Sequence, residues 1–180
     1  SQHSVRAHVC DVTDEADVAA FVAAVSAETD QIDVLINSVG SFGEIGAVSI
    51  GNSDQWWDTV KVNVFGPYLT IKHFLPLLER GRKPRIINFA GGGAFSPFPN
   101  YSAYACSKAA LVRLTECLAA ELRQKNIRVN AISPGIVATD IHKATIKAGE
   151  ERAGKLQYRR TLAVMQDGGP ALDEVVNCLK

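Results

Sequence analysis

The hydrophobic positions along the chain follow two spacings, one typical of strands and one typical of helices. Four short segments either alternate apolar with polar or small residues or are apolar throughout, as strands are: residues 5–10, 32–36, 85–89 and 128–132. Three longer segments repeat apolar residues every three or four positions, as helices do: residues 14–25, 53–79 and 104–124. Strands that alternate with helices predict a parallel sheet covered by helices on both faces.

Local signals predict where these helices begin and end. Thr13 and Ser53 are the expected N-caps, because a hydroxyl can accept a hydrogen bond from the first free backbone amides. Gly66–Pro67 is expected to kink or break the second helix. Beyond Thr139 the pattern is weakly helical and irregular to about residue 170, and residues 171–180 are expected to start another helix.

The composition is that of one globular domain over residues 1–180. With 47% hydrophobic and 21% charged residues, the chain can bury a sizeable core and is not of the disordered class. Lys and Arg number 19, as do Asp and Glu, so neither nucleic acid nor an anionic membrane is an expected partner. No apolar run approaches the roughly 18 residues that span a bilayer.

The cysteines and histidines indicate neither a disulfide framework nor a metal site. The cysteines lie far apart and form no Cys-x-x-Cys pair: Cys10, Cys106, Cys117 and Cys178. The histidines share no spacing typical of metal ligands: His3, His8, His73 and His142. We therefore expect reduced thiols, a cytoplasmic location and no bound metal.

Small or turn-forming residues follow each predicted strand, at Asp11–Val12, Asn37–Gly40, Ala90–Gly93 and Pro134–Gly135. The carboxyl ends of parallel strands share one edge of a sheet, where ligands bind. Residues without bulky side chains let backbone approach such a ligand closely. Loops are rich in these residues anyway, but four such loops in succession favour a binding crevice.

Tyr104 and Lys108 are one turn apart on the same face of a predicted helix. A phenol with its usual pKa near 10 is a poor base at neutral pH, and a nearby ammonium is expected to lower that pKa by favouring the phenolate. The pair is thus a physically sensible general acid/base unit. The alternative is an amphipathic helix on which both side chains merely flank the core.

The order and spacing of these motifs, together with Asn63, Asn88 and Asn130, resemble those of the short-chain dehydrogenase/reductase family. The resemblance runs from about residue 5 to about residue 139, and more loosely to the end. It implies a doubly wound parallel sheet of the Rossmann type and NAD or NADP as cofactor. It also implies hydride transfer between the nicotinamide and a secondary alcohol or ketone, a small-molecule substrate.

The resemblance also implies roles for individual residues. Tyr104 would be the acid/base, Lys108 its partner and a ligand of the nicotinamide ribose, and Asn63 the anchor of a relay water. Cofactor-binding residues would lie beside the adenine (Asp11, Val12), along its ribose (Asn37, Gly40) and at the nicotinamide carboxamide (Pro134, Gly135, Val137, Thr139). Asp11 has the alternative role of a helix-entry turn residue, and Asn63 that of a cap at the kink.

Two elements of the family have no counterpart in this sequence. The glycine-rich phosphate turn, which the family places after its first strand, is absent, because the sequence begins near the family's third strand. The last strand of the family would follow Lys180. We therefore expect a Rossmann fold that lacks its first βαβ segment and its last strand, in a fragment or the ordered part of a longer chain.

The family's catalytic Ser would lie about thirteen residues before Tyr104, where this sequence has Gly91. The segment from Asn88 to Gly93 has no hydroxyl. Either the backbone amides of Gly91 and Gly92 hold the substrate oxygen, or catalysis is impaired and the protein serves as a binding or scaffold protein. Gly91→Ser is expected to raise turnover, provided that Gly91 does not have a positive φ.

Two helices of this family commonly pair with their copies across two-fold axes. The corresponding segments here present mixed apolar and polar outer faces: Phe65, Tyr68 and Lys72 on residues 53–79, and Ala109, Val112, Arg113, Glu116 and Ala120 on residues 104–124. We expect a homodimer or homotetramer built on these faces. The alternatives are that other segments of the chain cover them, or that the chain is purely a dimerisation module.

Overall fold

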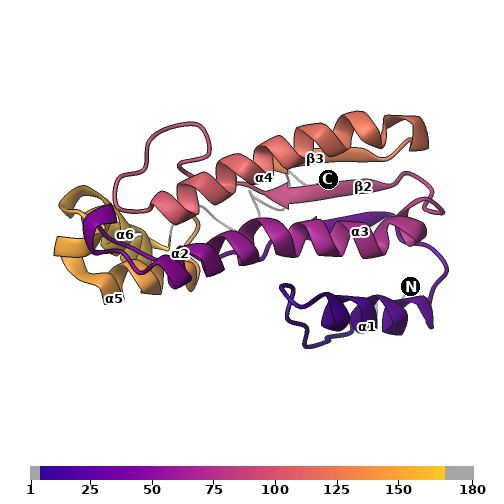
Figure 1. Ribbon diagram of the computed structural model, residues 1–180, viewed down its shortest axis with the longest axis horizontal. Coiled ribbons are helices and arrows are strands. Elements are labelled where there is room, and N and C mark those ends of the chain that lie inside the picture. The colour runs from indigo at the N-terminus through magenta and orange to yellow at the C-terminus, as the bar shows by residue number, and fades with distance from the viewer. Residues whose placement is uncertain (1–4, 169–180) are drawn as a thin grey trace.

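The computed structural model describes residues 5–168, which form an α/β fold around a parallel sheet (Figure 1). The sheet has the order β1 (Val34–Asn37), β2 (Arg85–Phe89) and β3 (Arg128–Ile132), and its register pairs Asn37 with Asn88 and Phe89 with Ile132. All three strands point the same way, so their carboxyl ends share one edge of the sheet. The predicted α/β class is confirmed.

Helices lie on one face of the sheet and beyond the carboxyl ends of its strands (Figure 1). The α-helices are α1 (Glu15–Ser26), α2 (Ser53–Val60), α3 (Gly66–Leu78), α4 (Ser102–Glu121), α5 (Ile141–Ala153) and α6 (Lys155–Asp167). Short 3-10 turns span Val48–Ile50 and Arg123–Lys125, and a π-helical turn spans Lys61–Phe65. No helix among residues 5–168 combines the length and the apolar character that crossing a bilayer requires.

The main core lies between α3, α4 and the sheet. It consists of buried aliphatic residues and one phenylalanine: Ile71, Phe74, Leu77, Leu78, Ile86, Leu122, Ile127 and Val129. Helix α1 packs outside α3, with the ring of Phe21 edge-on to that of Phe74 at 5.4 Å between centroids. This layering holds α4, which carries the Tyr-Lys motif, firmly along the sheet.

Among the described residues, one predicted strand is absent and one face of β1 lacks a covering helix. Residues 5–10 form no strand, and Val5 and Val9 are exposed, because no described strand lies beside them to share a hydrogen-bond ladder. Helices α3 and α4 cover one face only. The other face of β1 leaves Val34 and Ile36 44% and 45% exposed, so the predicted cover of both faces is not found there.

Both predicted N-caps are displaced by one residue. Asp14, and not Thr13, caps α1, because its carboxylate accepts hydrogen bonds from the amides of Ala16 and Asp17. Asn52, and not Ser53, caps α2 through the amide of Gln55. In each case the neighbouring residue can also act as a cap, and the geometry of the loop decides between the two.

Of the kink or break expected at Gly66–Pro67, the break is absent. The chain instead passes from α2 through the π-helical turn into α3, with Pro67 in the first turn, where its missing amide costs nothing. Gly66 is needed for close packing, because a Cβ there would lie 2.8 Å from Cγ2 of Val12. The loop after residue 10 therefore rests directly on the start of α3.

Residues 141–167 are more regular than their sequence suggests. Helices α5 and α6 form where an irregular segment was expected, since Thr145, Ala153 and Thr161 are buried and give these helices a tertiary face that the weak pattern does not reveal. Gly149 and Gly154 have φ values of 78° and 80°, which interrupt and end α5. The helix predicted at 171–180 lies outside the described residues.

Candidate active site

Tyr104 and Lys108 lie on the buried face of α4, at the carboxyl end of β2. Their residues are only 7% and 3% exposed. Nζ of Lys108 donates a hydrogen bond to the carbonyl oxygen of Phe89 at 2.7 Å and lies 5.7 Å from the centroid of the Tyr104 ring. The end of the strand thus holds the ammonium beside the phenol, and the motif predicted from its spacing forms one compact unit.

Burial dominates the ionisation of this pair. Loss of solvent raises the pKa of Tyr104 to about 12 and lowers the pKa of Lys108 to about 8. The expected lowering of the Tyr104 pKa is therefore wrong for this conformation, because Lys108 points at a backbone carbonyl and the ring is packed away from water. At neutral pH, Tyr104 is a proton donor and Lys108 is still largely an ammonium.

The surroundings of Lys108 fit a nicotinamide nucleotide. An ammonium has three donors, and among residues 5–168 only the Phe89 carbonyl accepts from it. A Cβ on Gly40 would lie 3.2 Å from Nζ of Lys108, so the backbone after β1 passes directly beside the ammonium. A Cβ on Gly92 or Gly135 would meet nothing within 4 Å. Two free buried donors beside open backbone can take the hydroxyls of a ribose.

Asn63 is fully buried in the π-helical turn and joins three segments. Its Oδ1 accepts from the Ser41 amide at 2.8 Å, and its Nδ2 donates to the Ser41 carbonyl and to Oγ of Ser107, both at 2.9 Å. Ser107 in turn donates to the Tyr104 carbonyl at 2.8 Å. The side chain of Asn63 therefore fixes the loop after β1 against α4. This contact joins separate segments, whereas the predicted cap at a kink would act only locally. The role of Asn63 as a water anchor stays a prediction.

Asn37 lies inside the sheet, where its side chain is used by protein partners. Its Nδ2 donates to Oδ1 of Asn88 at 2.9 Å, and its Oδ1 accepts from the Thr70 hydroxyl at 2.7 Å. Asn88 also donates to Thr115 on α4 at 2.9 Å. This buried network, which sequence reasoning missed, fixes the start of the turn between Asn37 and Gly40 and occupies the side chain of Asn37, so a cofactor would meet other atoms of that turn.

Asp11 adopts the alternative role of a turn residue at the entry to α1. Its Oδ1 accepts from the amide and the hydroxyl of Thr13 at 2.9 and 2.8 Å, and these hydrogen bonds lower its pKa. The Asp11 amide donates to Asp17 at 2.8 Å. The carboxylate stays exposed at the rim of the molecule, and Val12 packs on Gly66, so contact of either residue with an adenine remains a prediction.

The segment after β3 forms an open loop at the same sheet edge. Gly135 has a φ of 80°, which favours glycine, and Thr139 is exposed at the entry to α5. Val137 is half-buried, and burial lowers the pKa of His142 at the start of α5. Pro134, Gly135, Val137 and Thr139 thus belong to one stretch of backbone, and their contact with the carboxamide of a nicotinamide stays a prediction.

Aromatic side chains from three segments cover Tyr104. The ring of Phe42 lies edge-on to Tyr104 with 4.7 Å between centroids, and the ring of Phe98 lies 6.1 Å from that of Tyr104. Tyr101 packs against Phe42 and Phe98, at 5.2 and 4.4 Å between centroids. His142 of α5 lies 5.7 Å from Phe42. We call Phe42, Phe98, Tyr101 and His142 the aromatic wall. Sequence reasoning missed it because Phe42, Phe98 and His142 lie in segments that are far apart in the chain.

Gly91 makes room for the hydroxyl of Tyr104. It is buried and lacks a positive φ, but a Cβ there would overlap Oη of Tyr104 and lie 3.1 Å from its Cζ. Gly92 is exposed at the open end of the same turn. The expected gain from Gly91→Ser therefore does not fit the structure: steric contact, not backbone strain, opposes the substitution.

We now expect Gly91→Ser to lower turnover at least tenfold, because the new side chain would displace the Tyr104 hydroxyl from its position. Gly92→Ser is the matched control, since its Cβ has free space. Initial rates with a reduced nicotinamide nucleotide and a ketone measure both. Equal rates for the two variants, or a gain at Gly91, would show that the hydroxyl does not need this space.

Among residues 5–168, no three His, Cys, Asp or Glu side chains gather in a group that could hold a metal ion. The chemical groups gathered at the carboxyl end of β2 are a phenol, an ammonium and glycine backbone. Such a set suits proton transfer beside a bound nucleotide.

Comparison with known proteins agrees with this arrangement. The model of the family described as short chain dehydrogenase matches residues 1–150. The chain is 33% identical over 125 residues to the human "Dehydrogenase/reductase SDR family member 4". The aligned region covers 69% of this chain and 44% of that protein. It is 38% identical over 116 residues to a "Short-chain type dehydrogenase/reductase" of Picea abies, covering 58% of this chain and 43% of that one.

Solved structures show the same similarity. NAD+-bound xylitol dehydrogenase superposes with a TM-score of 0.75 at 31% identity, covering 87% of this chain and 63% of that one. Levodione reductase gives a TM-score of 0.74 at 29% identity, with coverages of 82% and 58%. The chain spans less than half the length of the curated relatives it matches.

Proposed function

The chain belongs to the short-chain dehydrogenase family, and from that premise we propose that it is an NAD- or NADP-dependent oxidoreductase that interconverts a ketone and a secondary alcohol. One observation carries the proposal: the buried Lys108 ammonium, with two donors free among the described residues, lies beside Tyr104 where open backbone passes. The similarity to an NAD+-bound xylitol dehydrogenase supports a nicotinamide cofactor.

Each residue then has a defined task. A bound nicotinamide would supply the hydride for the carbonyl carbon, or accept one from the alcohol. Tyr104 donates the proton that the carbonyl oxygen needs as the C=O π bond breaks, and its raised pKa keeps that proton available at neutral pH. Lys108 holds the ribose hydroxyls and stabilises the phenolate that remains. The protonated phenol favours reduction in this conformation.

The cofactor would be held mainly by backbone. Gly40, in the turn that starts at Asn37, lies beside Lys108, and Pro134, Gly135, Val137 and Thr139 would meet the carboxamide. Asp11 and Val12 would lie at the adenine end. Asn63 would keep this arrangement fixed through Ser41 and Ser107.

The missing serine leaves the substrate oxygen to Tyr104 and to backbone amides. Gly92 is exposed at the carboxyl end of β2, so its amide is the natural second donor, with Gly91 packed behind the phenol. The alternative is a member of the family that binds a nucleotide without turnover and acts as a binding or scaffold protein. This alternative is motivated by the absence of the serine hydroxyl, because loss of one such hydrogen-bond donor typically lowers the rate by about 10²–10³-fold.

One experiment separates these functions. The purified protein is mixed with NADH or NADPH, nucleotide fluorescence reports binding, and absorbance at the nicotinamide band reports oxidation in the presence of a panel of ketones. Binding with oxidation supports the oxidoreductase. Binding without oxidation supports the scaffold, and no binding of either nucleotide rejects both.

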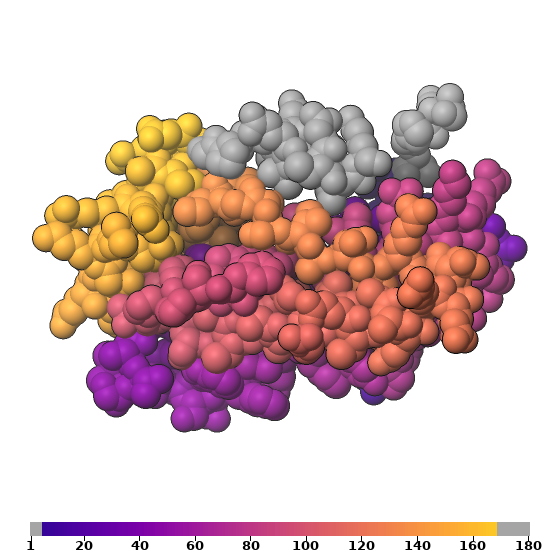
Figure 2. Space-filling model, turned by 90° about the horizontal axis from the view of Figure 1, so that it is seen from above, coloured from indigo at the N-terminus to yellow at the C-terminus, as the bar shows by residue number. Residues whose placement is uncertain are grey.

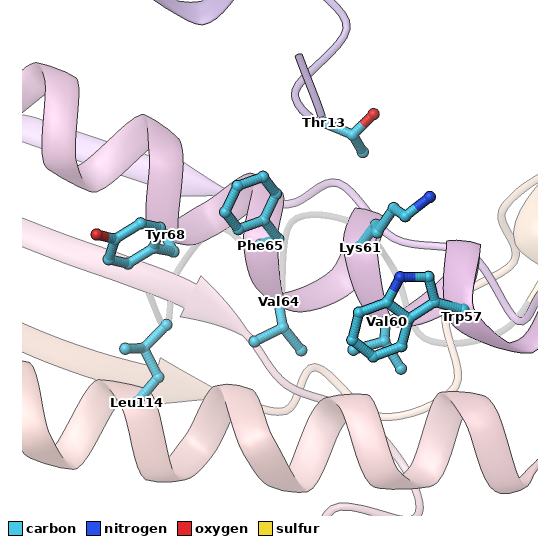
Figure 3. A pocket seen from close by; sticks show the side chains of 8 residues that line it. All are labelled: Thr13, Trp57, Val60, Lys61, Val64, Phe65, Tyr68 and Leu114. Atoms are coloured by element: carbon cyan, nitrogen blue, oxygen red, sulfur yellow. The ribbon is translucent and has the colours of Figure 1, made fainter. Parts of the chain in front are cut away.

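An apolar groove between α2–α3 and α4 supports assembly as a homodimer or as a homotetramer of two such dimers. Figure 3 shows Val64 and Leu114 reaching toward each other across it, with Phe65 and Tyr68 beside them. The groove has a volume of about 640 Å³. Phe65 and Tyr68 stack at 6.0 Å and are 41% and 42% exposed. Exposed aromatic pairs of this kind are typical of interfaces.

Lys72 on this outer face is held by a contact within the chain. It pairs with Glu15 of α1 at 2.6 Å, within the same chain. Arg113 pairs with Glu116 of its own helix at 2.6 Å, which leaves the small residues Ala109 and Ala120 exposed on α4 for close helix contact.

Phe65→Glu is expected to convert the assembly into monomers at micromolar concentration, because a charge would be buried without a partner at a cost of about 2 kcal/mol or more, roughly 30-fold in dissociation constant. Phe95→Glu changes another exposed phenylalanine, far from the groove in sequence, and serves as the control. Light scattering measures the mass of both. A monomeric parent protein would contradict the interface.

A cytoplasmic location is also proposed. It is supported by the free thiols of Cys10, Cys106 and Cys117 among the described residues.

A further inference from the structure

An ion pair joins helix α5 to the loop after β1. Nη2 of Arg152 lies 2.6 Å from Oε1 of Glu44, and Nε of Arg152 donates to the Ile45 carbonyl at 2.9 Å. The Glu44 side chain is 8% exposed, whereas that of Arg152 is 44% exposed. A carboxylate so deeply buried is stable only when it is paired and hydrogen-bonded. Glu44 thus strongly favours one position for Arg152.

Both sides of this ion pair carry the aromatic wall over Tyr104. The loop that holds Glu44 also holds Phe42, whose ring packs edge-on against Tyr104 at 4.7 Å. Helix α5, which holds Arg152, brings His142 to Phe42 and Thr145 to Tyr101, whose hydroxyls lie 2.9 Å apart. The ion pair is therefore one of the contacts that close α5 onto the wall.

Two glycines bracket Arg152. Gly149 and Gly154, with φ values of 78° and 80°, separate residues 150–153 from the helices on either side. A Cβ on Gly46 would lie 3.3 Å from Nε of Arg152, so the loop fits closely around the guanidinium. In Figure 2 the yellow atoms of α5–α6 adjoin the purple atoms of the loop near residue 50 and the pink atoms near residue 95.

This closure covers the phenol but not the nucleotide side of the crevice. Tyr104 is 7% exposed beneath the wall, so a substrate that reaches its hydroxyl must share this space with Phe42 and α5. Gly40 and Gly92 are exposed, and Lys108 contacts β2 rather than α5. A change in how α5 packs on the aromatic wall is thus expected to alter the affinity for the substrate and not the affinity for the nucleotide.

Resting on the proposed function, we propose that Arg152 and Glu44 are a positioning pair that holds Phe42 and α5 against Tyr104 and thereby sets the affinity for the carbonyl substrate. The pair touches neither substrate nor cofactor. It acts through the aromatic wall, and the flanking glycines let residues 150–153 move when a substrate enters.

Arg152→Met tests the pair, because it keeps the length of the side chain and removes both hydrogen bonds. With the ketone that the parent protein reduces fastest, KM is expected to rise at least fivefold, with kcat changed less than twofold and the dissociation constant of the nucleotide unchanged. Lys143→Met removes an exposed ion pair with Asp140 from the same helix and is the matched control, expected to match the parent.

A double-mutant cycle shows whether the two residues act together. Glu44→Gln keeps the size of the buried side chain and should raise KM as Arg152→Met does, while the double variant should be no worse than either single one. Glu44→Gln also serves if Arg152→Met does not fold. If the effects of the two substitutions on KM are additive, the two residues act independently and the proposed pair is rejected.

Hydrogen exchange of residues 42–46 and 141–153 provides a readout that does not need turnover. Faster exchange in Arg152→Met, with Lys143→Met unchanged, supports the pair even if the parent reduces no ketone, which would reject only the oxidoreductase. If the parent reduces a ketone and KM is unchanged in the Arg152 and Glu44 variants, the proposal of a positioning pair is rejected. The proposed oxidoreductase function is then still supported. Unchanged exchange likewise rejects the positioning pair.

Discussion

Tyr104→Phe is expected to lose nearly all turnover, by about 10²–10⁴-fold, while nucleotide binding stays within a few-fold of the parent. The substitution removes the proton that the carbonyl oxygen receives and keeps the ring, which packs at 4.7 Å from Phe42. Lys108 would keep its hydrogen bond to Phe89, so the ribose-binding donors remain. Nucleotide fluorescence and initial rates of ketone reduction measure the two effects separately.

Tyr68→Phe is the control for this experiment, because Tyr68 lies in the groove on the outer face of α3. It should retain the rate of the parent. Turnover of Tyr104→Phe within a few-fold of that rate would reject Tyr104 as the proton donor. Loss of nucleotide binding as well would indicate that the variant disturbs the fold of the crevice.

Lys108→Met is expected to lower turnover by at least 100-fold and, at the same time, to stabilise the fold. The ammonium is buried at a cost that lowers its pKa from 10.5 to about 8. That cost is present in full below pH 8, and it disappears as the pH rises from about 8 to 10.5. Met removes a penalty on the order of 2 to 3 kcal/mol at pH 7, less the lost hydrogen bond to Phe89.

Urea unfolding at pH 7 and at pH 10.5 checks both the size and the sign of this effect. The free energy of unfolding of Lys108→Met should exceed that of the parent at pH 7, and the difference should shrink at the higher pH. A variant that is less stable than the parent at pH 7 would mean that Lys108 is retained for the fold and not for the chemistry at Tyr104.

The best-predicted elements are those whose local pattern and tertiary role agree. Strands β2 and β3 have the predicted bounds, and α4 follows its apolar stripe from the Tyr-Lys motif onward. Tyr104 and Lys108 can be predicted as neighbours because residues four positions apart on a helix lie on the same face. Residues 5–10 have a strand pattern but no neighbouring strand among the described residues, and a strand exists only in a ladder.

Features that depend on long-range contact could not be read from the sequence. The pair Glu44 and Arg152 is separated by 108 positions, and neither residue has a local partner that marks it. The weak pattern of α5 hides a face that is defined only by Phe42 and Tyr101 opposite it. The pKa of Tyr104 was predicted in the wrong direction because the local motif contains the ammonium but not the aromatic wall that excludes water.

Transfer of deuterium tests the central claim, hydride transfer assisted by Tyr104, most directly. The purified protein is incubated with a ketone and with NADH or NADPH that carries deuterium at C4 of the nicotinamide, on one face at a time, and the alcohol is examined by mass spectrometry. We predict that deuterium from one face alone appears on the carbinol carbon, and that Tyr104→Phe forms almost none of this product. An alcohol without deuterium from either face, or no alcohol from any ketone despite bound nucleotide, would contradict the account.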